Sequence, residues 1–133
     1  MKFREYLTEG NSSARLDHKI QDLKSRVFID SYLKDSEKNW LDGDREIKAV
    51  STTIDLNTKT KEIYLNRMDA HRTGKGYGRE ALEFILKYTK SKGYKSAKGY
   101  TEFGAIDSQN MLTKLGFKPG TDQDSGKYFI RKL

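Results

Sequence analysis

The hydrophobic pattern of the chain changes its period at one short glycine-rich segment. Before this segment, strand-like apolar runs occupy residues 27–33, 47–56 and 62–68, with polar turns at 42–44 and 57–60. After it, apolar positions over residues 79–92 follow the three- and four-residue spacing of a helix. The pattern predicts an antiparallel meander that leads through a glycine turn into an amphipathic helix.

The remaining C-terminal part continues with strands and one more helix. Gly93 stands where a left-handed cap ends the first helix, and residues 94–101 form the next predicted strand. The pattern predicts a second helix over residues 107–115, with Gly116 as its cap, and a final strand over residues 127–133. This order of elements predicts an α+β (mixed α/β) domain around one sheet.

The N-terminal part is less regular. Leu16, Ile20 and Leu23 have the spacing of one helix face after a cap at Ser12 or Ser13, and a strand is the competing interpretation. Residues 1–13 are predicted to be an appendage or leader, and residues 14–133 the folded domain.

Length and composition limit the classes of protein. A chain of 133 residues fits one domain, and no apolar run reaches membrane-spanning length. Cysteine is absent, and the two histidines, His18 and His71, have no ligand-like spacing, so no metal site is expected. These features predict a cytoplasmic protein. The net charge of +7 is spread along the chain and would favour a phosphorylated ligand, an acidic partner or nucleic acid.

Three alternating glycines give the glycine-rich segment its chemistry. Gly74, Gly76 and Gly78 lie between a predicted strand and a predicted helix. Glycines permit dihedral angles at which successive amides point at one anion, and a helix N-terminus adds free N–H groups and a positive dipole end. The segment therefore predicts a site for a phosphate-bearing ligand.

Two nucleotide motifs fit this segment poorly. A Walker loop requires Lys-Ser or Lys-Thr after its last glycine, whereas this chain has Arg79-Glu80. Residues 76–81 match the dinucleotide pattern G-x-G-x-x-A, and Glu102 lies near the place of a ribose-binding acid. That pattern should open a series of parallel βαβ units, but polar antiparallel strands precede it and only 52 residues follow Ala81.

Two segments resemble one family. Residues 73–78 resemble the R/Q-x-x-G-x-G/A pyrophosphate loop of GNAT-superfamily acyltransferases, and residues 111–117 resemble the Leu-Tyr-x-Lys-x-Gly-Phe segment of that family. The match covers residues 62–117 and, by element order, residues 27–133. It implies a GNAT-like fold, in which helices flank one mostly antiparallel sheet that is splayed between two strands.

The resemblance also implies an activity, the transfer of an acetyl group from acetyl-CoA to an amine by direct attack. The amides of residues 74–78, with Arg79, would hold the pyrophosphate, and Met68 would end the splayed strand. Arg72, Lys75 and Lys114 would be candidates for the outer phosphate. The residues expected at the cofactor site are Met68, Arg72, Thr73, Gly74, Lys75, Gly76, Tyr77, Gly78, Arg79 and Lys114.

Three positions depart from the family pattern. Thr73 stands at the family's arginine or glutamine, Leu112 at its tyrosine acid and Ala105 at its asparagine. The proton for the coenzyme thiolate would then come from Tyr128, Tyr100, Ser108 or water. The loss of a general acid need not abolish turnover, since such help contributes about 10²–10⁴-fold.

Amine acylation also needs a base. The candidates nearest the expected gap between strands are Glu62, Asp69, Glu102 and His71, and Glu102 is preferred because it follows the strand opposite the acyl group. The catalytic residues predicted here are therefore Glu102, Glu62 and Tyr128.

The acceptor side is expected to be reduced. Family members have two helices between their first two strands, and little chain is available for them before Val27. The resemblance therefore implies an open pocket for a small-molecule or protein amine, or a pocket completed by a second subunit of a homodimer.

The first ten residues resemble the capsid-targeting leaders of internal head proteins in large tailed phages. Those leaders are cut after Leu/Ile-x-Glu, which residues 7–9 match. This resemblance implies a location in the host cytoplasm or the virion interior. Two alternatives to the enzyme remain: a non-catalytic acyl-CoA-binding protein of the same fold, and a basic, nucleic-acid-associated virion protein.

Overall fold

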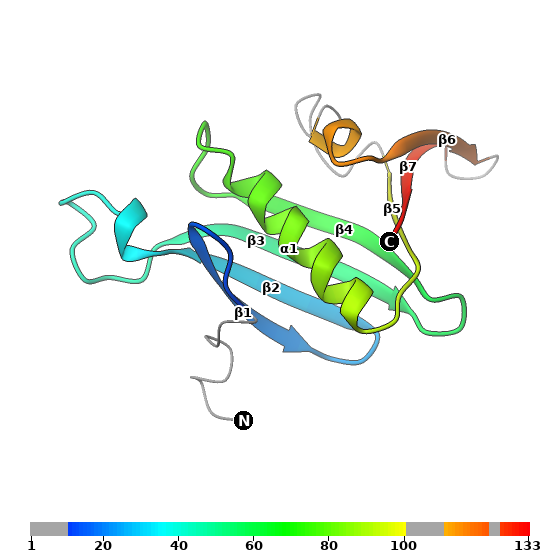
Figure 1. The fold of residues 1–133 in the computed structure, drawn as a ribbon, viewed down its shortest axis with the longest axis horizontal. Helices are drawn as coiled ribbons and strands as arrows, with labels where there is room; N and C mark the ends of the chain where they lie inside the picture. Colours follow the sequence, from blue (N-terminus) through cyan, green and yellow to red (C-terminus); the bar gives the residue numbers. More distant parts are fainter. Residues whose placement is uncertain (1–10, 101–110, 123–125) are drawn as a thin grey trace.

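The computed structural model describes residues 11–100, 111–122 and 126–133 of the chain. Seven strands form one sheet, and one long helix, α1 (Tyr77–Ser91), packs on it (Figure 1). The strands are β1 (Leu16–Asp22), β2 (Arg26–Leu33), β3 (Lys48–Asn57), β4 (Glu62–Ala70), β5 (Ser96–Tyr100), β6 (Lys118–Asp122) and β7 (Gly126–Lys132).

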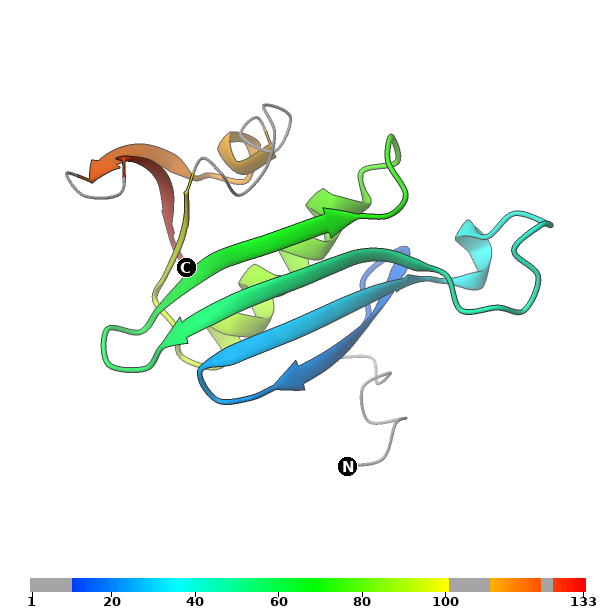
Figure 2. The same ribbon diagram turned by 180° about the vertical axis from the view of Figure 1, so that it is seen from behind.

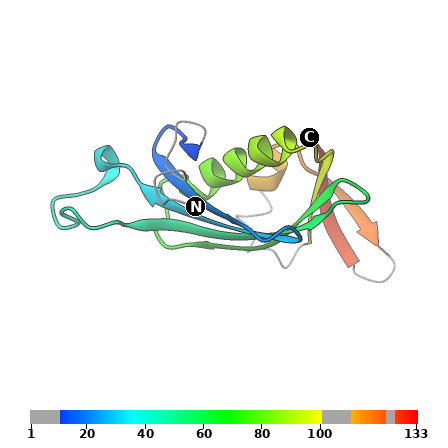
Figure 3. The same ribbon diagram turned by 90° about the horizontal axis from the view of Figure 1, so that it is seen from below.

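The strand order is β1-β2-β3-β4-β5-β7-β6. Among the described strands, only β4 and β5 pair in parallel, and α1 makes the crossover between them. Helix α1 lies across one face of strands β1 to β4, whereas no described helix lies on the opposite face, as Figures 2 and 3 show. The sheet is therefore mostly antiparallel and belongs to an α+β fold, as the sequence predicts.

Helix α1 forms because its apolar residues recur on one face. These residues are buried against the sheet: Tyr77, Ala81, Leu82, Phe84, Ile85, Leu86 and Thr89. The helix ends in a Schellman arrangement, in which Gly93 N–H bonds to the Lys90 carbonyl and Tyr94 N–H bonds to the Thr89 carbonyl. Gly93 has a φ of +93°, so the predicted left-handed cap is confirmed.

The predicted helix around residues 16–23 is wrong. This segment is strand β1, in which Leu16, His18 and Ile20 are buried and the residues between them are partly exposed. The alternation is hard to see in the sequence because one of the buried positions carries a polar imidazole. The strand interpretation, which competed with the helix, is the correct one. The sequence also gave no signal for β6, whose residues include Pro119 and Gly120.

The second predicted helix is described only in its C-terminal part. Residues 111–114 are helical, and Gly116 (φ +88°) ends them in a second Schellman arrangement, with Phe117 N–H on the Leu112 carbonyl. Residues 107–110 and the leader-like residues 1–10 lie outside the described part of the chain. The leader therefore stays a prediction.

Strands β1 and β2 are joined by residues 23–25 alone. Their register runs from Leu16 opposite Leu33 to Asp22 opposite Val27, so the two strands form a simple hairpin. No helices intervene between them, as the short N-terminal part of the sequence predicts.

Candidate functional site

The glycine loop joins the end of β4 to the start of α1. Gly74 and Gly76 have φ values of +79° and +77°, a left-handed conformation that side chains rarely tolerate. Gly76 is the N-cap of α1, and no side chain caps this end. The helix's hydrogen bonds begin with Glu80 N–H on the Gly76 carbonyl, at 3.2 Å. The amides of residues 76–79 therefore precede the helical bonding and, with the helix dipole, form a site suited to an anion.

Strands β4 and β5 diverge beside this loop. They pair only from Glu62 opposite Ser96 to Leu65 opposite Gly99, whereas β4 continues to Ala70. A bulge in the β3–β4 register falls at Asn66, where the parallel pairing stops. Along residues 66–70, the described part of β5 leaves this edge of β4 without strand partners. Main-chain groups on such an edge can pair with an extended ligand.

Two methionines flank the first turn of α1. A β-carbon added to Gly78 would lie 3.7 Å from Met68 Sδ and 3.9 Å from Met111 Sδ. The predicted site residues Met68 and Gly78 are therefore neighbours in space. Met68 also packs against both hydrophobic clusters of the core, so it links the end of β4 to the helix.

Both arginines predicted at the site, Arg72 and Arg79, already have carboxylate partners. Arg72 Nη2 lies 2.8 Å from Oδ1 of Asp42, whose side chain is only 4% exposed. The hydrogen bond from Arg72 holds the pKa of Asp42 below its usual range. Arg79 pairs with Glu83 at 3.2 Å. In the described structure, Arg72 thus anchors the β2–β3 loop rather than pointing freely at a ligand.

The other predicted binding residues divide into packing and exposed positions. Tyr77 is buried, and its hydroxyl donates to Glu37 at 2.9 Å, so its side chain serves packing while its amide belongs to the loop. Thr73 and Lys75 are exposed on the loop. Lys114 is exposed on the helical segment 111–114.

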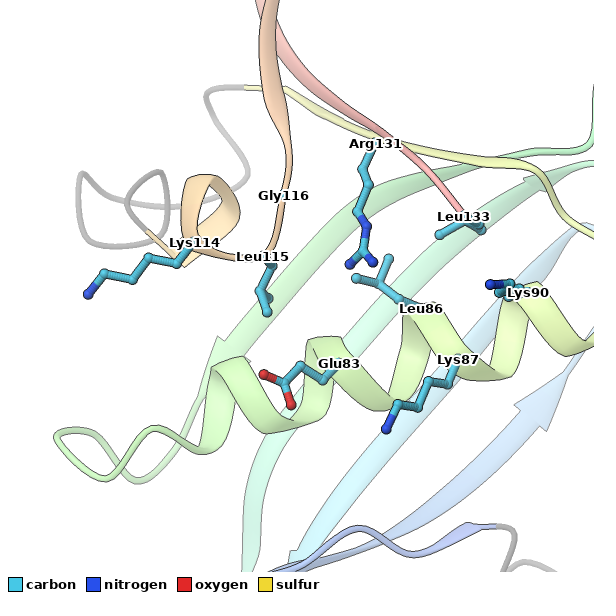
Figure 4. A pocket seen from close by; sticks show the side chains of 9 residues that line it. All are labelled: Glu83, Leu86, Lys87, Lys90, Lys114, Leu115, Gly116, Arg131 and Leu133. Carbon is cyan, nitrogen blue, oxygen red and sulfur yellow. The ribbon is translucent and has the colours of Figure 1, made fainter.

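A basic groove runs along α1 on the side of β7. It has a volume of about 560 Å³, and its lining includes Lys87, Lys90, Lys114, Arg131 and Glu83. Figure 4 shows Arg131 pointing from β7 toward Leu86 on the helix, while Lys114 extends away from the centre of the groove. Within the described residues, none of these four cations forms an ion pair with a carboxylate. The groove therefore has positive charge available for an anionic group.

The predicted catalytic residues are only partly brought together. Glu62 lies at the closed end of the parallel ladder, opposite Ser96, and accepts a hydrogen bond from the Ser96 hydroxyl at 3.0 Å. Tyr128 lies opposite Tyr100, one residue beyond the last β4–β5 pair, so it is one strand away from the divergence. Glu102 lies outside the described residues. Of the further base candidates, Asp69 pairs with Arg67 and His71 contacts Ser51.

Sequence reasoning missed a second group of residues at the loop. Arg15, just before β1, bonds to Glu80 in the first turn of α1 and to the main chain of Lys75. Ser13 and His18 continue this hydrogen-bonded chain into the sheet. These residues are separated from the loop by about 60 positions, and no local pattern links them to it.

The described residues include no candidate metal site and no candidate membrane span. No group of three or more histidine or acidic side chains is placed to hold a metal ion. No helix in the described ranges is both long enough and apolar enough to cross a membrane.

Solved structures of acetyltransferases share this fold. The chain is similar to the PaiA N-acetyltransferase of Thermoplasma acidophilum in complex with coenzyme A, at 18% identity and a TM-score of 0.63, over 82% of this chain and 62% of that one. It is also similar to a Bacillus subtilis acetyltransferase in complex with coenzyme A, at 11% identity and a TM-score of 0.63, over 84% and 80% of the two chains. No family model matches the sequence. No match to a curated protein was found.

The similarity extends to a Desulfovibrio desulfuricans structure named as an acetyltransferase of the GNAT family, at 14% identity and a TM-score of 0.60 over 84% of this chain and 70% of that one. At these identities the likeness establishes the fold. The chain has a GNAT-like fold, with one mixed sheet that diverges between β4 and β5 and a glycine loop at the start of the crossover helix.

Proposed function

We propose that this protein is an acyl-CoA-dependent N-acyltransferase that moves an acetyl group from acetyl-CoA to an amine. The observation that carries the proposal is the glycine loop, with its uncapped amides at residues 76–79, directly beside the edge of β4 that the described part of β5 leaves unpaired. An anion cradle and an unpaired strand edge together suit a ligand that has both a pyrophosphate and an amide-containing arm.

Each part of the site would hold one part of acetyl-CoA. The amides of residues 76–79 would bind the pyrophosphate, and the β4 edge at residues 66–70 would pair with the pantetheine arm. Lys114, near the glycine-loop end of the basic groove, would contact the outer phosphate (Figure 4). Arg72 has no such role in this proposal, because Asp42 occupies its guanidinium group.

The amine would approach from the face of the sheet opposite α1. No described helix covers this face, and the β1–β2 hairpin leaves out the segment that would enclose it (Figure 2). Asp55 lies on this face near the bulge, where Arg26 and Asn66 bond to it. Burial raises the pKa of Asp55, but these bonds outweigh it and keep the pKa below its usual range, so the carboxylate stays charged. Arg26 pairs with this carboxylate at 2.6 Å, so Asp55 adds no net negative charge to attract a cationic amine of a small molecule or of a protein side chain.

The reaction forms a C–N bond and breaks the thioester C–S bond. The acceptor ammonium must first lose a proton, and Glu102 is the proposed base in preference to Glu62, which lies at the closed end of the β4–β5 ladder. The leaving thiolate takes up a proton, for which Tyr128 is the proposed donor, one strand away from the divergence of β4 and β5. A second subunit of a homodimer could cover the open acceptor face.

One observation favours a second candidate, a protein that binds acyl-CoA without catalysis. Leu112, at the position of the family's tyrosine acid, is 1% exposed within the hydrophobic core. Its side chain stabilises the packing of residues 111–117 and has no proton to donate. If Tyr128 does not replace the missing acid, cofactor binding would persist while turnover is slow or absent.

Calorimetry with acetyl-CoA tests the binding half of the proposal, and release of free thiol across a panel of amines tests the chemistry. We expect saturable binding and amine-dependent thiol release. Binding without turnover on any amine would favour the non-catalytic alternative. An absence of heat at millimolar acetyl-CoA would refute both.

A further inference from the structure

Arg15 contacts both sides of the start of α1. Its backbone N–H and its Nε donate to the two carboxylate oxygens of Glu80, each at 2.9 Å. Its Nη1 donates to the main-chain carbonyl of Lys75 at 2.6 Å, and its guanidinium group lies 4.7 Å from the centre of the Tyr77 ring. One side chain from the start of the sheet therefore holds both the glycine loop and the first turn of the helix.

The bond to the Lys75 carbonyl determines where the next amide points. The chain has no cis peptide among its described residues, so the Lys75–Gly76 peptide is trans. In a planar trans peptide, the C=O and the following N–H point in opposite directions. Because Arg15 holds the carbonyl on its own side, the Gly76 N–H points to the opposite side of the loop, away from the guanidinium group. The contact thus fixes the direction of one amide of the cradle.

The bonds to Glu80 hold its carboxylate at Ser13 and Arg15. With Gly76 as the N-cap, Glu80 is the fourth helical residue, one position beyond the glutamate of a capping box. Here the Glu80 side chain instead accepts bonds from the Ser13 hydroxyl (2.6 Å) and twice from Arg15. Burial would raise the pKa of Glu80, but these bonds outweigh it and lower the pKa, so the carboxylate is charged. Arg15 neutralises that charge, which would otherwise repel an incoming phosphate.

A chain of hydrogen bonds anchors this arrangement in the sheet. The Ser13 hydroxyl proton is directed to Glu80, so the 3.0 Å contact between Ser13 Oγ and His18 Nε2 requires a proton on Nε2. His18 Nδ1 is then an acceptor for the Ser31 hydroxyl on β2, at 2.8 Å. The Ser13 hydroxyl also lies 3.4 Å from the Leu16 carbonyl, a longer contact than the 2.6 Å bond to Glu80. These hydrogen bonds therefore link Glu80, to which Arg15 binds, with the sheet core through Ser13, His18 and Ser31.

We propose that Arg15 is a positioning residue of the phosphate loop. It takes the place of the arginine or glutamine of the family pattern, at whose position this chain has Thr73. It orients the Gly76 amide through the Lys75 carbonyl and neutralises the Glu80 carboxylate beside the amides of residues 76–79. This inference rests on the proposed function for the identity of the ligand. The effect of Arg15 on the loop does not depend on a bound ligand.

The test uses Arg15→Gln and Arg15→Lys in the full chain, with Arg45→Gln as a matched control. Arg45, like Arg15, donates to the main chain of a loop, but its acceptors are the carbonyls of Leu41 and Asp42 in the β2–β3 loop. The first readout is NMR relaxation of the Gly74 and Gly76 amides in the ligand-free protein. We expect higher mobility of both amides in Arg15→Gln, a smaller change in Arg15→Lys and no change in Arg45→Gln.

The second readout is the affinity for CoA. Arg15→Gln should raise Kd roughly 10- to 100-fold and KM for acetyl-CoA in parallel, while kcat at saturation stays near that of the wild type. Unchanged glycine relaxation in both Arg15 variants would overturn the positioning role. A wild-type protein that does not bind CoA would refute the proposed function alone, because the relaxation result stands by itself. If Arg15→Gln fails to fold, the comparison between Arg15→Lys and Arg45→Gln decides the question.

Discussion

The imidazole of His18 stacks on the ring of Phe84, with the ring centres 3.9 Å apart and the planes inclined by 14°. His18 is on strand β1 and Phe84 is on helix α1, and the histidine side chain is fully buried. Burial lowers the pKa of His18 to about 4. The neutral imidazole therefore belongs to the native structure, in which both of its nitrogens are hydrogen-bonded.

This low pKa predicts that stability falls in mild acid. In the unfolded chain a histidine has a pKa of about 6.5, so between pH 6.5 and about 4 the unfolded state binds a proton that the folded state does not. The contribution of His18 is fully present above pH 6.5 and is lost as the pH falls toward 4. We expect the free energy of unfolding to be about 2 kcal/mol lower at pH 5 than at pH 7. Urea denaturation at the two pH values measures this difference.

Two variants serve as controls for that measurement. His18→Gln should be less stable at pH 7, but should show little change between pH 7 and pH 5. His71→Gln, which alters an exposed histidine, should keep the wild-type pH dependence. Equal stability of the wild type at pH 7 and pH 5 would contradict a neutral, buried His18.

A matched pair of glycines separates the function of the loop from its stability. Gly74 (φ +79°) and Gly93 (φ +93°) flank the two ends of α1, and an added β-carbon would meet no atom within 4 Å at either position. Alanine at each should cost about 1–2 kcal/mol of stability through backbone strain alone. We expect only Gly74→Ala to weaken CoA binding, because relief of the strain there rotates the amides of the cradle. Calorimetry with CoA on both variants makes the comparison, and equal affinities would argue against the cradle.

Lys114 is predicted to recognise the outer phosphate of CoA. Lys114→Gln should weaken binding of CoA by roughly threefold, as expected for one exposed ion pair, and should leave the affinity for dephospho-CoA unchanged. Lys61→Gln, at the exposed β3–β4 turn, should alter neither affinity. An equal loss of affinity for both ligands would place Lys114 elsewhere on the cofactor.

Tyr128 is predicted to protonate the leaving thiolate. Removal of its hydroxyl in Tyr128→Phe should lower kcat by about 10²-fold while KM for acetyl-CoA stays unchanged, since the ring remains in place. Tyr32→Phe, on β2 and away from the β4–β5 divergence, is the control and should retain activity. Full activity of Tyr128→Phe would indicate that water supplies the proton.

The elements with clear periodicity were predictable because their signals are local. The alternation at 27–33 and 62–68, and the helical stripe after Gly78, each depend on neighbours within a few residues. Strand β1 was mispredicted because His18 is a polar residue at a buried position, where tertiary partners compensate its burial. The loop glycines were also identifiable, since left-handed φ values are a property of single residues.

The side-chain partners of the site had no such signal. Arg72 looked like a free cation of the loop until the fold placed Asp42 beside it, 30 positions away. No local sequence pattern pointed to Arg15, and its contact with Lys75 spans 60 positions. The sequence alone determined the glycine cradle and the elements on either side of it, because backbone conformation and hydrophobic period are local. Only the tertiary structure decided which charges serve that cradle, because an ion pair depends on where the sheet brings distant residues together.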